Sequence, residues 1–181
     1  MASYPDFFWS DLFQKNKSNQ KSISPVLQEN ILFCTLSPRE LKYLTRLVYE
    51  RVYQSNEPIF KQNDRGIGMY LIVQGQVAIR AHNAQGEVLV TMLTEGSFFG
   101  EIALVDVNNI RTASATALER TVIIGFFKPD LIEILERKPA MGVKILFQLA
   151  AVLGRRLAET TEKITQLYRF KNGEKPNETG I

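Results

Sequence analysis

The chain has 181 residues, of which 45% are hydrophobic, 10% aromatic and 23% charged, as expected for one globular domain with a sizeable core. Its single cysteine, Cys34, excludes a disulfide framework and a cysteine-based zinc site, and is typical of a reducing compartment. Its single histidine, His82, argues against a histidine metal site and a Ser-His-Asp triad. No apolar run approaches the roughly 18 residues that cross a bilayer, and the first residues do not resemble a signal peptide. We therefore expect a cytoplasmic protein that holds no metal and no cofactor.

The net charge of +3 is small and local. Lys15, Lys17 and Lys21 lie in one polar stretch and supply three positive charges, so the rest of the chain sums to 3 − 3 = 0. A neutral body has no broad positive surface for a phosphate backbone, and three lysines in a linker keep it solvated. We therefore expect neither a nucleic-acid partner nor a membrane partner.

The first 27 residues are expected to precede the main domain. Residues 6–13 place Trp9, Leu12 and Phe13 at helical spacing after Pro5, which predicts a short aromatic helix. Residues 14–24 are polar and lack periodicity, which predicts a linker. The aromatic helix could pack on its own domain, on a sister subunit, or on a different protein.

A capping box opens the next predicted helix. Residues 28–33 first give one or two apolar helical turns. Ser37 can then accept a hydrogen bond from the backbone N–H three residues on, Pro38 suits the first helical position, and Glu40 can reach back to the cap. Apolar residues follow at helical spacing: Leu41, Leu44, Leu47 and Val48. The sequence predicts a helix over residues 38–48.

Short β-rich runs separated by turn residues come next. They are Val48–Tyr53, Pro58–Phe60, Met69–Gln74, Gln76–Ala81, Val88–Leu93, Ala113–Ala117 and Val122–Phe127. Many short strands at this spacing predict a small barrel or jelly roll, in which two sheets close over one another. His82 ends one strand, where we expect an exposed side chain.

Two further helices are predicted, over residues 128–137 and from Pro139 to about Phe170. Residues of the second helix recur in alternating steps of four and three: Leu146, Ala150, Leu153, Leu157, Thr160, Ile164 and Leu167. Such a heptad seam packs against another helix, and a second copy of the same helix is the simplest partner, so we expect a homodimer. Residues 171–181 are expected to be disordered. The predicted fold class is α+β, a jelly-roll barrel flanked by N-terminal helices and a long C-terminal helix.

One stretch between the strands carries residues suited to anion recognition: Phe98-Phe99-Gly100-Glu101-Ile102-Ala103-Leu104, followed by Arg111-Thr112-Ala113-Ser114. Gly100 allows a tight turn, and the residues after it can begin a short helix whose N–H groups bind phosphate. Arg111, at the start of a strand, can pair with phosphate oxygens, and Thr112 offers a hydroxyl. Glu101 can accept a hydrogen bond from a sugar hydroxyl. One loop would then hold a phosphate beside a ribose.

This combination resembles the phosphate-binding cassette of the cyclic nucleotide-binding domain family, with the pattern Phe-Gly-Glu-x-Ala-Leu, a short loop, and Arg-Ser/Thr-Ala-Ser/Thr. The spacing from Glu101 to Arg111 is similar to that of bacterial catabolite activator proteins, and the resemblance extends over residues 28–170. The departures are Asn63, where the family usually has glycine and where asparagine can adopt positive φ, and Ile110, where proline is frequent.

The resemblance implies a double-stranded β-helix and a site for cyclic AMP or cyclic GMP. Glu101 would bind the ribose 2′-hydroxyl and Arg111 the cyclic phosphate, while Ala103 and Thr112 would add contacts. The nucleotide-binding residues that it implies are Phe99, Gly100, Glu101, Ile102, Ala103, Leu104, Arg111, Thr112 and Ala113.

Several functions are consistent with these residues. The first is a non-enzymatic sensor, with cyclic AMP favoured over cyclic GMP, in which the C-terminal helix moves as a lid and signals through a dimer or an unknown protein partner. The alternative is a barrel that has lost nucleotide binding and serves as a dimerisation or docking module. Residues 171–181 are too few for a helix-turn-helix, which argues against a transcription factor. No nucleophile is arranged with a base, which argues against an enzyme.

Overall fold

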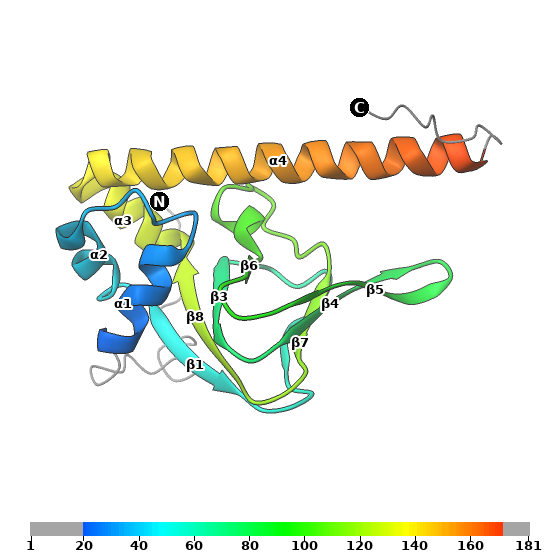
Figure 1. Cartoon of the computed structure of the whole chain (residues 1–181), viewed down its shortest axis with the longest axis horizontal. Coiled ribbons are helices and arrows are strands. Elements are labelled where there is room, and N and C mark those ends of the chain that lie inside the picture. Colours follow the sequence, from blue (N-terminus) through cyan, green and yellow to red (C-terminus); the bar gives the residue numbers. More distant parts are fainter. Residues whose placement is uncertain (1–19, 172–181) are drawn as a thin grey trace, which may run out of the picture.

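The computed structural model describes residues 20–171 (Figure 1). The predicted aromatic helix over residues 6–13 and residues 172–181 of the predicted tail lie outside this range. The helices are α1 (Gln20–Glu29), α2 (Pro38–Leu44), the 3-10 helix η1 (Glu101–Leu104), α3 (Lys128–Arg137) and α4 (Pro139–Lys171). The strands are β1 (Tyr49–Tyr53), β2 (Pro58–Phe60), β3 (Gly68–Gln74), β4 (Val77–Asn83), β5 (Gly86–Leu93), β6 (Phe98–Phe99), β7 (Ser114–Ala117) and β8 (Thr121–Phe127).

The strands form two antiparallel four-stranded sheets, in the orders β1-β8-β3-β6 and β2-β7-β4-β5. This arrangement confirms the predicted jelly roll and every predicted strand, with ends shifted by up to two residues. The two-residue strand β6 was not predicted, because two apolar residues are too few to show the alternation of a strand. β8 is buried along nearly its whole length because it pairs with β1 on one side and β3 on the other. His82 lies near the end of β4 and is exposed, as expected.

The N-terminal helices correct two predicted boundaries. The predicted linker over residues 14–24 is wrong from residue 20, where α1 begins, and the packed body therefore starts before residue 28. Ile23 and Leu27 are one helical turn apart and are buried in the core, a periodicity too short to stand out among polar neighbours. Residues 30–35 form turns rather than a continued helix.

The predicted capping box of α2 is confirmed: Ser37 Oγ accepts from Glu40 N at 3.4 Å, and Glu40 accepts from Ser37 N at 2.7 Å. α2 nevertheless ends at Leu44 and not at residue 48. Thr45 Oγ1 donates to the carbonyl oxygen of Lys42 at 2.9 Å, and the last turn tightens into i→i+3 bonds before Val48 is buried and β1 begins.

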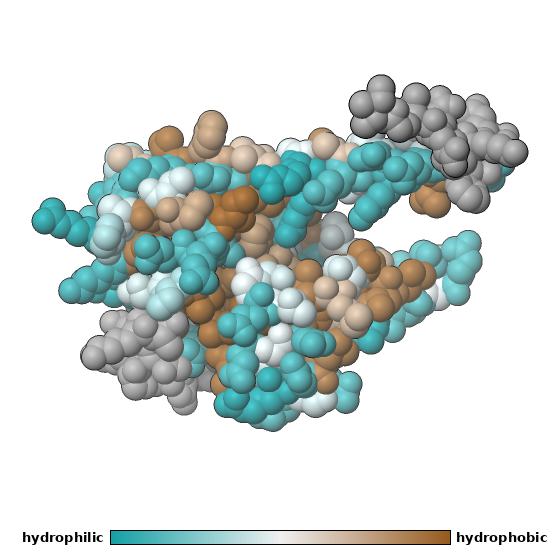
Figure 2. Space-filling view, viewed as in Figure 1, coloured by the Kyte–Doolittle hydropathy of each residue, from teal (hydrophilic) through white to brown (hydrophobic). Residues whose placement is uncertain are grey.

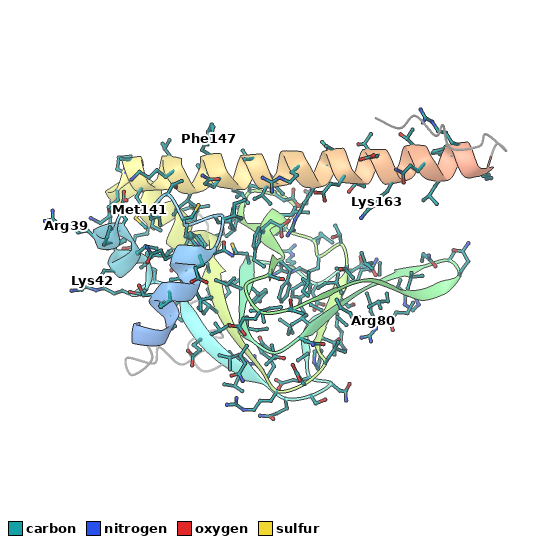
Figure 3. The ribbon with its side chains drawn as sticks, viewed as in Figure 1. Arg39, Lys42, Arg80, Met141, Phe147 and Lys163 are labelled. Carbon is teal, nitrogen blue, oxygen red and sulfur yellow. The ribbon has the colours of Figure 1, made fainter. Side chains whose placement is uncertain are left out.

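α4 runs across the top of the roll and continues past it, above the β4–β5 hairpin (Figure 1). Its lower face packs on the core through Met141, Ile145, Leu149 and Val152. Met141 points toward the body, whereas Phe147 points away from it (Figure 3) and is 74% exposed. No helix within residues 20–171 has the length and apolarity needed to cross a membrane.

The predicted heptad seam is wrong at two of its positions. Leu146 and Leu153 are partly buried against the protein's own core, so they do not face outward with the rest of the seam. One set of exposed residues in steps of four and three is what we call the outer face of α4: Val143, Phe147, Ala150, Gly154, Leu157, Thr161, Ile164 and Tyr168. Thr160 and Leu167 of the predicted seam are exposed beside it.

The β4–β5 hairpin carries a second exposed apolar surface. Val88, Leu89, Val90 and Met92 of β5 are 48–61% exposed. Figure 2 shows this apolar patch on the hairpin, with open space between it and the projecting end of α4. Lys163 extends from α4 toward this space (Figure 3).

Candidate functional site

The turn between β6 and η1 depends on a glycine. Gly100 has a φ of +74°, in the left-handed region that glycine adopts without strain. A Cβ atom at this position would also lie 2.5 Å from Nη1 of Arg111. Backbone conformation and space both exclude a side chain here, so the arginine can approach the turn closely.

The short helix η1 is anchored in the two hydrophobic clusters of the roll. Phe99, just before it, belongs to one cluster and stacks on Tyr70 with ring centroids 5.5 Å apart. Leu104, at its end, is buried in the other cluster, and Ala103 is buried as well. Ile102 points outward and is 43% exposed. The buried ends hold the loop in place while one side chain remains at the surface.

Arg111 enters the interior of the roll and is only 5% exposed. Nη1 donates to the carbonyl oxygen of Gly100 at 3.0 Å, and Nη2 donates to that of Gly68 at 2.8 Å. The guanidinium carbon lies 4.1 Å from the ring centroid of Phe60 and 5.4 Å from that of Tyr70. Two carbonyls and two aromatic faces therefore fix the orientation of this side chain.

Among residues 20–171, the charge of Arg111 lacks a direct counterion. Within residues 20–171 no carboxylate forms an ion pair with it, and Glu101 and Asp64 act on it only at longer range. Its Nε is buried without a hydrogen-bond partner among the described residues. Burial lowers the pKa of Arg111 from its ordinary value and raises that of Tyr70, with the attraction between the two groups opposing both shifts. A buried cation with an unused donor is costly unless an anion joins it.

The backbone of Arg111 is held by the turn that follows β2. Its N–H donates to the carbonyl oxygen of Asp64 at 2.9 Å, and its carbonyl oxygen accepts from Asn63 N at 2.9 Å. Asn63 has a φ of +71°, which agrees with the expectation that asparagine replaces glycine there. A Cβ on Gly66 would come within 2.5 Å of the guanidinium, so this glycine leaves room for the arginine as well.

Glu101 is 3% exposed and is paired with a residue that sequence reasoning did not place in the site. Its Oε1 lies 2.6 Å from Nη1 of Arg156, on α4. Nη2 of Arg156 also donates to the carbonyl oxygen of Phe98 at 3.1 Å, and its guanidinium lies 4.8 Å from the Phe98 ring centroid. Arg156 lies one helical turn after the buried Val152, so it continues the side of α4 that faces the core. A cation on this apolar side was the feature of the sequence that could have indicated a role for Arg156 in the site.

The remaining predicted site residues lie beside Arg111. Thr112 is exposed, and its hydroxyl has no hydrogen-bond partner in the described part of the chain, while Ala113 is partly buried. β7 begins only at Ser114, so Arg111 precedes the strand instead of starting it as predicted. The structure therefore brings Gly100, Glu101 and Arg111 together, with Thr112 at their rim.

Comparison with known proteins identifies the family. Residues 50–138 match the sequence pattern of the cyclic nucleotide-binding domain. These residues belong to that family. The cyclic AMP receptor protein of Thermus thermophilus is 36% identical over 129 residues, which are 71% of this chain and 57% of that protein. The human cGMP-dependent protein kinase 2 is 30% identical over 115 residues, which are 63% of this chain and 14% of the kinase.

A crystal structure of the Thermus thermophilus catabolite activator protein superposes with a TM-score of 0.69 at 33% identity, covering 77% of this chain and 63% of that one. This chain thus spans somewhat more than half of its bacterial relative and a small part of the kinase. The cyclic nucleotide-binding domain is the part that they share.

An open hollow of about 460 Å³ lies elsewhere on the cyclic nucleotide-binding domain. Its lining includes Gln62, His82, Ser114 and Thr116. Ser114 and Thr116 alternate along β7 with the buried Ala115, which places this hollow on the outer face of the second sheet. None of the residues predicted to bind nucleotide lines it, and Gln62 already uses its side chain on the backbone of His82.

Proposed function

We propose that this chain is a non-enzymatic receptor for a cyclic nucleotide, with cyclic AMP bound more tightly than cyclic GMP. The observation that carries the proposal is the buried guanidinium of Arg111, which has no ion-pair partner among residues 20–171 and one unused donor. A cyclic phosphate monoanion supplies the missing charge and can accept from a guanidinium. The preference for cyclic AMP is supported by the similarity to the cyclic AMP receptor protein of Thermus thermophilus.

The ribose is assigned to Glu101, which lies beside Arg111 and accepts hydrogen bonds only. Its Oε1 pairs with Arg156, while the described residues provide no partner for Oε2. A ribose hydroxyl can donate to that second oxygen without displacing the arginine. In this assignment Arg111 binds the phosphate and Glu101 binds the sugar.

α4 is proposed to report occupancy, because Arg156 holds it against Glu101. A hydroxyl on Glu101 withdraws electron density from the carboxylate that binds Arg156, so the free energy of that contact depends on the ligand. A ligand shifts a helix only by its difference in affinity for the two helix positions, and such coupling is about 1–3 kcal/mol in typical allosteric proteins.

The output is proposed to pass through a homodimer formed by the outer face of α4. Phe147, Leu157 and Tyr168 on this face are 65–74% exposed, and their heptad spacing matches a second copy of the same helix. An exposed apolar stripe of this length is unusual for a monomer. Leu157→Glu places a charge at the centre of the stripe and is expected to convert a dimer to a monomer in native mass spectrometry.

The test is calorimetric titration with cyclic AMP and cyclic GMP, together with thermal unfolding. A ligand at about 100 times its Kd stabilises the folded state by ~2.7 kcal/mol, so cyclic AMP should raise the Tm clearly. Arg111→Ala should weaken binding about tenfold to a hundredfold, because a hydrogen bond to a charged group contributes about 1.5–3 kcal/mol.

Arg120→Ala removes an exposed arginine from the loop between β7 and β8 and serves as the matched control, with unchanged affinity expected. Equal affinity of Arg111→Ala and the parent would overturn the assignment of the phosphate. No change in Tm with a large excess of either nucleotide would favour a dimerisation or docking module that has lost the ligand.

A further inference from the structure

Lys128, the first residue of α3, contacts both segments that support Arg111. Its backbone N–H donates to the carbonyl oxygen of Ile67 at 2.7 Å. Its Nζ donates to the carbonyl oxygen of Asp106 at 2.9 Å. One residue therefore ties the start of β3 and the loop after η1 to the start of α3.

The backbone hydrogen bond of Lys128 to Ile67 supports the position of the Arg111 side chain. Ile67 precedes Gly68, whose carbonyl oxygen accepts from Nη2 of Arg111 at 2.8 Å. Gly68 also pairs with Phe127, directly before Lys128. The backbone of Lys128 thus fixes the peptide next to the one on which the guanidinium rests.

The side-chain hydrogen bond of Lys128 to Asp106 supports the loop that joins Glu101 to Arg111. Val105 and Val107 in this loop are 44% and 87% exposed, so apolar packing holds little of it. The loop is joined to the turn after β2 through Gly66 N, which donates to the carbonyl oxygen of Asn109 at 2.6 Å. A loop with so little buried surface depends on its hydrogen bonds for a single conformation.

We propose that Lys128 is a positioning residue for the cyclic phosphate: it sets the separation of Arg111 from Glu101 and links the phosphate site to α3. The inference rests on the proposed function for its ligand. α3 packs against α4. A movement of the loop after η1 on ligand binding is therefore transmitted to both helices through the hydrogen bond of Lys128 to Asp106, as well as through Arg156. Binding groups work only when their supporting contacts hold them in place.

The test compares Lys128→Met, which keeps the aliphatic stem, with Lys128→Arg, which keeps a donor. Lys42→Met is the matched control, because Lys42 points into solvent from α2 (Figure 3). The Kd for cyclic AMP should rise about tenfold in Lys128→Met and recover most of the way in Lys128→Arg. On an Arg111→Ala background Lys128→Met should have almost no further effect, because both changes act on the same phosphate contact. An unchanged Kd in Lys128→Met, or losses that add in full, would overturn the proposal.

A second measurement needs no nucleotide and separates this proposal from the proposed function. Amide hydrogen exchange of the ligand-free protein should become about tenfold faster at Gly66 and Arg111 in Lys128→Met, with β4 and β5 unchanged. The same exchange rates in parent and variant would refute the positioning role even if the parent binds no nucleotide. Faster exchange in Lys128→Met than in the parent, together with a parent that binds no nucleotide, would support the positioning role of Lys128 and refute the proposed function.

Discussion

The contact between Glu101 and Arg156 can be measured by a double-mutant cycle of Glu101→Gln, Arg156→Met and the double variant. Met keeps much of the aliphatic stem of Arg156, and Gln keeps the shape of the buried Glu101 side chain. Two unit charges about 4 Å apart attract by ~4 kcal/mol at an effective dielectric constant of about 20. The side chain of Arg156 is 43% exposed and that of Glu101 4% exposed, so solvent screening and the desolvation of the carboxylate offset much of this attraction. We expect a coupling free energy of about 1–2 kcal/mol, above the ~0.2–1 kcal/mol of exposed pairs.

The assay is urea unfolding of the ligand-free protein, with the free energy of unfolding of the four proteins compared at equal protein concentration. Independent sites add to within about 0.3–0.5 kcal/mol. A coupling below that range would mean that the pair does not hold α4 on η1, and the proposed route from the ribose site to α4 would be lost. A coupling of the expected size supports the pair as a contact that holds α4 on η1.

Two further predictions concern the turn and the helical end of the molecule. Gly100→Ala should destabilise the protein more than Gly96→Ala in urea unfolding, although both glycines have a positive φ, because only the Cβ at residue 100 would meet Arg111. Backbone strain of about 1 kcal/mol is common to both variants. Equal losses of unfolding free energy in the two variants would show that the guanidinium of Arg111 moves aside at no cost. Partial burial alone would raise the pKa of Glu40, but its bonds to Lys144 and Ser37 outweigh this and lower it. A lowered pKa stabilises the folded state above the unfolded value of 4.5, and this contribution is lost as the pH falls through the folded pKa. Lys144→Met should therefore reduce the loss of unfolding free energy between neutral pH and acid, and an unchanged pH dependence would contradict the role of this ion pair.

Predictions from the sequence succeeded where neighbouring residues decide the structure. The capping box at Ser37 and Glu40 acts within one turn, and the strands show the alternation and the turn residues of their own segments. Gly100 followed by a short helix is likewise a local feature, and so is the positive φ of Asn63. The spacing of the short strands predicted the jelly roll, and the family resemblance, whose most specific residues lie in 98–114, implied the same fold.

Features that depend on packing across the molecule were decided only in three dimensions. Glu101 and Arg156 are 55 residues apart, and they meet because α4 crosses the roll above η1. The heptad pattern predicts an apolar seam along α4. Only the packing of α4 on the rest of the domain decides that Leu146 and Leu153 contact the hydrophobic core while Leu157 is exposed. The sequence by itself determined the strands, the glycine turn and the residue types of the site. The tertiary structure decided that Arg111 is buried without an ion-pair partner among residues 20–171, because burial and charge pairing depend on which segments the fold brings together.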